Sequence, residues 1–129
     1  MTTPSHRKPT SSELQILHIL WERGPSTVRE VHQALFEKRP IGYTSVLKLM
    51  QIMTAKGTVR RNEEQRAHVY EAVQPAEKTK RELALDVLQR VFDGSASELM
   101  MHALAGRKAS KEEIDEMRRL LNEHERKLR

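Results

Sequence analysis

Apolar residues recur every three or four positions through the first half of the chain, and this spacing predicts three consecutive helices. The first covers about residues 11–23 and is apolar almost all round, as expected of a helix at the centre of a domain. Gly24 and Pro25 end it. The second covers about residues 28–37, and after a turn the third covers about residues 43–56.

The third helix has two chemically different sides. At 100° per residue, one side collects the apolar residues Val46, Leu49, Met50 and Met53. The other side collects Thr44, Lys48, Gln51 and Ala55. We expect the apolar side to face the core, which leaves the polar stripe facing either water or a ligand that it reads.

Helix starts are marked by a repeated pattern. Four times a Ser or Thr is followed three residues later by Glu, directly before an apolar-periodic stretch. This is the capping-box pattern, in which the hydroxyl and the carboxylate each accept a backbone N–H of the first turn. The predicted pairs are Thr10/Glu13, Thr27/Glu30, Ser95/Glu98 and Ser110/Glu113.

After Gly57 the apolar period changes from helical spacing to two. Residues 58–61 and 66–73 alternate around a polar turn, which predicts a β-hairpin. Pro75 then opens a long helix that reaches about Phe92, followed by a short helix at about residues 96–105 and a last helix from about Lys111.

The charge distribution adds a functional signal. The chain of 129 residues carries a formal net charge of +5, and residues 1–74 hold 11 Lys and Arg against 7 Asp and Glu. Between Glu37 and Glu63 there is no acid, whereas six bases occur there. A basic window of this kind is typical of a surface that faces phosphate.

Three helices followed by a hairpin, with bases on the third helix and on the hairpin, predict a mainly α protein with a winged helix-turn-helix at residues 1–74. In that fold the third helix enters the major groove of double-stranded DNA while the wing follows the backbone. Lys48 can donate to guanine and Gln51 can pair with adenine. Polar helix stripes usually face solvent, but the basic window together with the element order favours nucleic-acid binding. The predicted base-reading residues are Thr44, Ser45, Lys48 and Gln51, and the predicted backbone contacts are Lys38, Arg39, Tyr43, Lys56, Arg60, Arg61, Arg66 and His68.

Residues 75–129 predict a helical dimerisation tail. Their three short amphipathic helices are too small to close a core alone, so we expect them to bury their apolar faces against a second copy. The alternative is that they fold back on the DNA-binding unit of the same chain. The predicted dimer contacts are Leu83, Val87, Leu88, Val91, Leu99, Met100, Leu104, Ile114, Met117 and Leu121.

Several stretches resemble the penicillinase-repressor (BlaI/MecI) family. The resemblance covers residues 13–24 in the first helix, 27–31 in the second, 43–57 in the third and 66–70 in the wing, and it extends through the tail. It implies a homodimeric repressor of antibiotic-resistance genes on a palindromic operator, relieved when a membrane sensor-protease of the BlaR/MecR type leads to repressor cleavage. Ile52 stands where many relatives carry Arg, and Lys48 where many carry Thr, so the operator sequence does not transfer from them.

The resemblance also implies a cleavage position. In close relatives the induced cut falls at an Asn-Phe bond in the short tail helix, and alignment puts His102 and Ala103 at that bond. Neither residue matches. We therefore expect either a sensor-protease of altered specificity or release by another route.

Enzyme, metal and membrane functions find little support in the sequence. The six histidines show no catalytic spacing, Cys is absent, and Glu98 with His102 supplies too few ligands for a metal, so no cofactor is expected. The longest apolar run is three residues, which predicts a cytoplasmic protein that does not bind membranes. The remaining alternative to DNA binding is a winged helix that binds protein.

Overall fold

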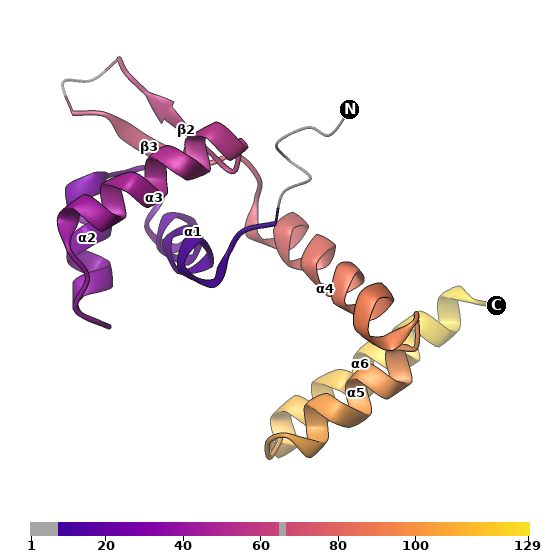
Figure 1. Cartoon of the computed structure of the whole chain (residues 1–129). Helices are drawn as coiled ribbons and strands as arrows, with labels where there is room; N and C mark the ends of the chain where they lie inside the picture. Colours follow the sequence, from indigo (N-terminus) through magenta and orange to yellow (C-terminus); the bar gives the residue numbers. More distant parts are fainter. Residues whose placement is uncertain (1–7, 65–66) are drawn as a thin grey trace. The chain divides into compact units, whose positions relative to one another are not determined.

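The computed structural model describes residues 8–64 and 67–129, and within them the chain forms a mainly helical structure with a small sheet (Figure 1). It divides into two compact units, Met1–Leu83 and Ala84–Arg129. The elements in chain order are α1 (Ser11–Arg23), β1 (Ser26–Thr27), α2 (Val28–Phe36), α3 (Tyr43–Lys56), β2 (Val59–Asn62), β3 (Val69–Ala72), α4 (Ala76–Phe92), α5 (Ala96–Ala105) and α6 (Lys111–Lys127).

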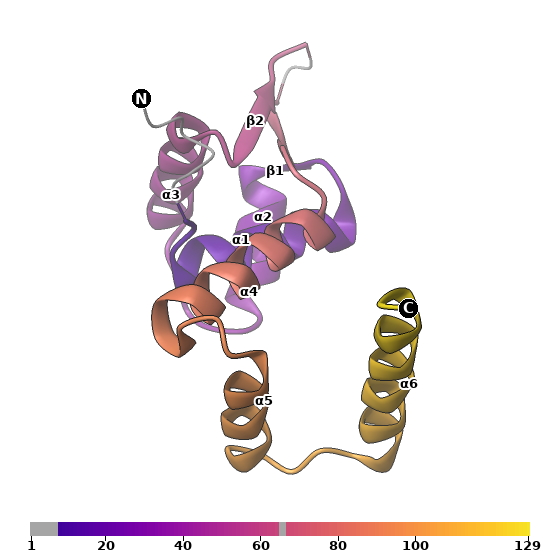
Figure 2. The same cartoon turned by 90° about the vertical axis from the view of Figure 1, so that its right-hand side faces the viewer.

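The first unit is built on the three predicted helices and the predicted hairpin. The strands form one antiparallel sheet in the order β1-β3-β2, with Arg61 of β2 opposite Tyr70 of β3. Figures 1 and 2 both show the β2–β3 hairpin projecting beyond the helices of this unit. This arrangement is a winged helix, so the predicted fold class is confirmed.

Strand β1 was not predicted. It consists of only Ser26 and Thr27, which pair with Tyr70 and Val69 of β3. Two residues are too few to show an alternating pattern, and both are polar. Their pairing depends on β3, which lies more than forty residues later in the chain, so no local signal marks them.

The core of the first unit brings together all three helices and the sheet. From α3 it takes Val46, Met50 and Met53, each with no exposed surface. Leu49, the fourth apolar residue of the predicted stripe, is half-buried against the same core. One side of α3 is thus fixed in the core, which leaves the opposite side facing outward. The other buried apolar residues are Ile16, Leu17, Ile19, Leu20, Val28, Val31, Leu35, Val59 and Tyr70.

The predicted caps set the helix starts. Complete capping boxes form at Thr10 with Glu13 and at Thr27 with Glu30. Hydrogen bonds from the backbone N–H and the hydroxyl of Thr27 hold the pKa of Glu30 below its ordinary value. At Ser95 and Ser110 the hydroxyl accepts the predicted backbone N–H, but the Glu113 carboxylate pairs with Arg107.

The first unit extends further than the predicted boundary after Gln74. The Trp21 indole N–H donates to the carbonyl oxygen of Gln74 at 3.0 Å. The Thr79 hydroxyl, on a side chain that is 9% exposed, donates to Oε1 of Gln74 at 3.0 Å. These contacts tie the first turns of α4 to the winged helix, and the division accordingly falls after Leu83.

The second unit leaves its apolar residues largely uncovered. Neither α5 nor α6 has a buried residue, although both carry Leu and Met or Ile side chains. Val91 is 62% exposed, Met101 60% and Leu121 56%. Within the described residues, no helix has the length and apolar character needed to cross a membrane.

Candidate nucleic-acid interface

The outward side of α3 carries the predicted base-reading residues. Thr44, Ser45, Lys48 and Gln51 are all exposed, and they lie on the helix surface opposite the buried Val46, Met50 and Met53. Ala55 is exposed on the same side and is small enough to let another molecule approach the helix closely. The structure therefore brings these four residues onto one surface, while their contact with bases stays a prediction.

The N-terminal end of α3 is held by an aromatic cluster. Nε2 of His32 in α2 lies 2.8 Å from the carbonyl oxygen of Ile41, directly before the N-cap Gly42. The His32 ring also contacts the Tyr43 ring edge-on at a centroid distance of 5.8 Å. Tyr43 stays 46% exposed, so its phenol can reach a phosphate beside the helix start.

The first turn of α3 has no side-chain cap, because its N-cap is Gly42. The amide groups of this turn therefore remain available to an external acceptor, and the helix dipole favours an anion there. Lys38 and Arg39 are exposed in the turn before α3, with Arg39 donating to the Ser12 hydroxyl at 3.3 Å. These cations and the helix start form a second positive region beside the α3 stripe.

The wing carries its bases on β2, and acids lie beside them. Nε of Arg60 lies 2.6 Å from Oε1 of Glu71 on β3. Arg61 pairs with Glu63, and its side-chain hydrogen bond with Tyr70 is the largest cause that raises its pKa. Both guanidinium groups remain exposed, so each can still reach a phosphate, although in competition with its acid.

Two further backbone contacts were predicted on the wing, His68 and Arg66. His68 is exposed directly before β3. Arg66 lies outside the described residues.

Lys56 occupies a different environment from the other predicted backbone contacts. Its ammonium lies 2.9 Å from Oε1 and 3.1 Å from Oε2 of Glu13, and it donates to the Lys8 carbonyl at 3.5 Å. The side chain of Lys56 is 16% exposed and that of Glu13 only 3%. The ammonium is thus directed into the protein, where it ties the end of α3 to the start of α1.

Sequence reasoning missed the acids that pair with these bases. Glu13 and Glu71 lie outside the acid-free window of residues 38–62, yet they contact Lys56 and Arg60 inside it. In the hairpin register Arg60 lies opposite Glu71. Because the length of the turn sets this register, the turn length was the sequence signal that could have predicted the Glu71 pairing. The Glu13 pairing joins two helices and has no local signature.

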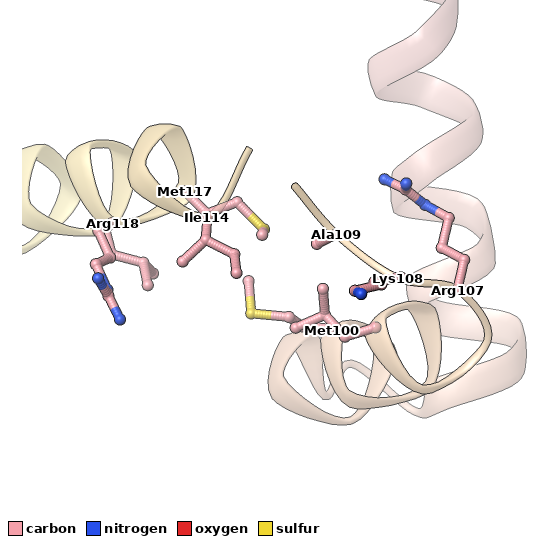
Figure 3. Close-up of a pocket in the computed structure, with 9 residues that line it drawn as sticks. Met100, Arg107, Lys108, Ala109, Ile114, Met117 and Arg118 are labelled. Carbon is pink, nitrogen blue, oxygen red and sulfur yellow. The ribbon is translucent and has the colours of Figure 1, made fainter. Parts of the chain in front are cut away.

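The predicted dimer contacts of the second unit surround an open apolar groove. In Figure 3, Met100 of α5 points toward Ile114 and Met117 of α6 across this groove, which has a volume of about 420 Å³. Leu104 and Leu121 also line it, and Arg107, Lys108 and Arg118 stand at its edge. Elsewhere in the predicted set, Leu83, Leu88 and Leu99 are half-buried, and Val87 and Val91 are exposed.

The predicted cleavage position lies within α5. His102 and Ala103 are both exposed, and the His102 carbonyl accepts from Gly106 N–H at 3.1 Å. The His102 ring lies 5.8 Å from the Phe92 ring, measured between centroids. The bond is therefore on the surface but in helical backbone.

A winged helix that presents a lysine and a glutamine outward on its third helix, with arginines on the wing, has the arrangement of a DNA-binding transcriptional regulator. Comparison with known proteins identifies the family: residues 9–123 match the family model described as penicillinase repressor. The chain belongs to the penicillinase repressor family, whose members are transcriptional regulators and not enzymes.

Relatives and one solved structure accompany this match. The transcriptional regulator BlaI of two Mycobacterium tuberculosis strains is 33% identical over 115 residues, which cover 88% of this chain and 82% of that protein. A cysteine-to-serine mutant of Lactococcus lactis ZitR aligns with a TM-score of 0.42 and 14% identity, over 100% of this chain and 84% of that chain.

Proposed function

We propose that the chain is a homodimeric repressor that binds a palindromic operator with α3 in the major groove and the β2–β3 hairpin as wing. One observation carries this proposal: the polar stripe of α3 is exposed along its length, while Val46, Met50 and Met53 on the opposite side are fully buried. A helix anchored in this way presents Lys48 and Gln51 in a defined orientation. That orientation is what base reading requires.

The roles of the side chains follow from their chemistry. The Lys48 ammonium donates to guanine O6 or N7, and the Gln51 amide pairs with the N6 and N7 edge of adenine. Thr44 and Ser45, in the first turn, reach a base edge or a phosphate near the positive end of the helix dipole. Arg60, Arg61 and His68 on the wing contact phosphates and fix the position of the protein on the duplex.

The tail joins two copies of the chain, and the second copy supplies a second DNA-binding module. One winged helix with a few phosphate contacts binds DNA at roughly 10⁻⁴ to 10⁻⁶ M without sequence preference. Linking two modules makes the second engagement intramolecular and raises overall affinity by about 10² to 10⁴. The uncovered apolar residues of α5 and α6 support this role, because large apolar patches on a protein surface mark sites of association.

Release of the operator follows from loss of the dimer. A cut within α5 or α6, by a membrane sensor-protease of the BlaR/MecR type or by another protease, separates apolar residues that hold the two copies together. Operator affinity then falls toward that of a single module, with α3 itself unchanged. Regulation of antibiotic-resistance genes by a protein of the cytoplasm is the biological setting that this mechanism fits.

Selection from random DNA tests the proposal. The full-length protein is mixed with a random duplex pool, and bound DNA is recovered, sequenced and assayed at several salt concentrations. We expect a palindromic site whose binding weakens by about 0.9 log unit per log unit of salt for each neutralised phosphate. If no sequence is enriched and the protein shows no salt-dependent binding to DNA, operator binding is refuted. The alternative of a winged helix that binds protein is then favoured.

A further inference from the structure

Ile52 is an apolar residue in an unexpected place. It lies on the outward side of α3, one helical turn after Lys48 and directly after Gln51, and its side chain is 39% exposed. Among the described residues of the first unit, the other large apolar side chains with this degree of exposure are Phe36, Tyr43 and Val73, and none of them lies within the α3 stripe. Ile52 therefore interrupts a surface that is otherwise polar or small.

A solvent-facing position does not explain an isoleucine well. Because β-branched residues are poorer helix formers than Lys, Arg, Glu or Ala, an exposed helix position gains nothing from isoleucine. Isolated exposed apolar residues are ordinary on protein surfaces. This one, however, directly borders the two side chains that our proposed function assigns to bases.

The major groove offers one apolar group at a base edge, the C5 methyl of thymine. We propose that Ile52 reads this methyl group and so specifies a T·A pair beside the base pairs contacted by Lys48 and Gln51. The inference rests on the proposed operator binding and adds to it one base position and its identity.

The chemistry of isoleucine suits this contact. Its χ1 is held largely in one rotamer by the helix, so ordering the side chain against a base costs little conformational freedom. Covering the thymine methyl removes apolar surface of both partners from water. One buried methyl or methylene group corresponds to about a fourfold change in affinity. Ala55, one turn closer to the C-terminal end of the stripe, leaves room for the approach.

Replacing thymine by uracil tests the contact directly, because uracil lacks only the methyl group. In the selected operator, each thymine of a half-site is replaced in turn by uracil, symmetrically in both half-sites, and binding of the full-length protein is measured. At one position we expect the native protein to lose about fourfold per half-site. Ile52→Ala is expected to bind the thymine operator more weakly by a similar factor and to show no difference between thymine and uracil at that position.

Val73→Ala provides a matched control. Val73 is also 39% exposed but follows the wing rather than lying on α3. It should bind like the native protein and retain the full sensitivity to uracil.

Two results would overturn the inference while leaving operator binding intact. In one, uracil has the same effect on the native protein and on Ile52→Ala at every position. In the other, the selected half-site has no thymine whose replacement weakens binding. Failure of the native protein to select any sequence would instead refute the proposed function. Thermal unfolding of Ile52→Ala, expected to match that of the native protein, separates a lost contact from a lost fold.

Discussion

The Lys56 ammonium, at the last residue of α3, lies 2.9 Å from the carboxylate of Glu13, which is only 3% exposed near the start of α1. The same carboxylate accepts the Thr10 N–H at 3.3 Å as part of the α1 capping box. One acid thus completes a helix start and fixes the end of the recognition helix. In the free protein Lys56 is therefore tied to Glu13, and its predicted contact with a phosphate stays a prediction.

Replacing Lys56 by methionine distinguishes these two roles. Since removing one partner leaves the Glu13 carboxylate buried without its cation, we expect the free energy of unfolding to fall by about 3 kcal/mol. Urea titration measures this change. The exposed Lys38→Met serves as control and should stay within about 0.5 kcal/mol of the native protein.

The salt dependence of DNA binding completes the test of Lys56. If Lys56 is structural, the slope of log affinity against log salt is the same for Lys56→Met and the native protein. A slope reduced by about 0.9 would show that Lys56 neutralises a phosphate.

Base reading and backbone positioning predict different effects of mutation. Lys48→Ala and Gln51→Ala should each weaken operator binding by about 1 to 3 kcal/mol while changing binding to random DNA much less. Arg60→Ala and Arg61→Ala should weaken both DNAs alike and reduce the salt slope. Competition titrations with operator and random duplexes measure both quantities. Equal losses on the two DNAs for Lys48→Ala would contradict its assignment to a base.

The wing acid Glu71 should restrain DNA binding. Its carboxylate holds Arg60 at 2.6 Å, and Glu71→Gln frees the guanidinium and removes a negative charge from the same surface. We expect tighter binding to any duplex, by roughly threefold to tenfold at low salt, with the gain disappearing as salt increases. Glu22→Gln makes the same change of charge on α1 and should have a smaller effect. Unchanged binding by Glu71→Gln would show that Arg60 does not contact DNA.

Local patterns predicted the elements well because the signals at their ends are local. Thr10 and Thr27 mark helix starts through hydrogen bonds that span three residues, and Gly57 ends α3 in the left-handed conformation with φ of 85°. Local patterns could not predict contacts between residues that are distant in the sequence. Ser26 with Tyr70, Trp21 with Gln74 and Glu13 with Lys56 each join residues more than forty positions apart.

The same limit applies to the candidate site. The helical period of α3 was sufficient to place Thr44, Ser45, Lys48 and Gln51 on the outward side, because the apolar residues alternate with them at fixed spacing. It was not sufficient to show which cations are free. Lys48 and Lys56 look alike in sequence, and only the fold directs one outward and the other toward Glu13.

Truncation tests the tail as the dimer interface. A chain ending at Leu83 keeps the Trp21 and Thr79 contacts with Gln74, so we expect it to fold, to sediment as a monomer and to bind the operator about 10² to 10⁴ times more weakly. A chain ending at Gln74 loses the Thr79 hydroxyl and should be less stable by about 1 kcal/mol in urea. A dimer formed by the chain that ends at Leu83 would show that the interface lies in the winged helix.

The last prediction concerns cleavage at His102. Because α5 has no buried residue, opening this helix to the extended backbone that a protease needs costs little, so access does not protect the bond. The bond is instead protected by its side chains. When alanine rather than phenylalanine occupies a protease pocket shaped for phenylalanine, the binding free energy is weaker by about 2 kcal/mol or more. We therefore expect a sensor-protease that cuts Asn-Phe bonds to leave the native chain intact and to cut the double variant His102→Asn, Ala103→Phe. Intact-mass analysis of the native chain and of the double variant, after induction in cells that contain such a sensor, measures the cleavage of each. A fragment of the native chain that ends at His102 would show that the sensor accepts His102 and Ala103.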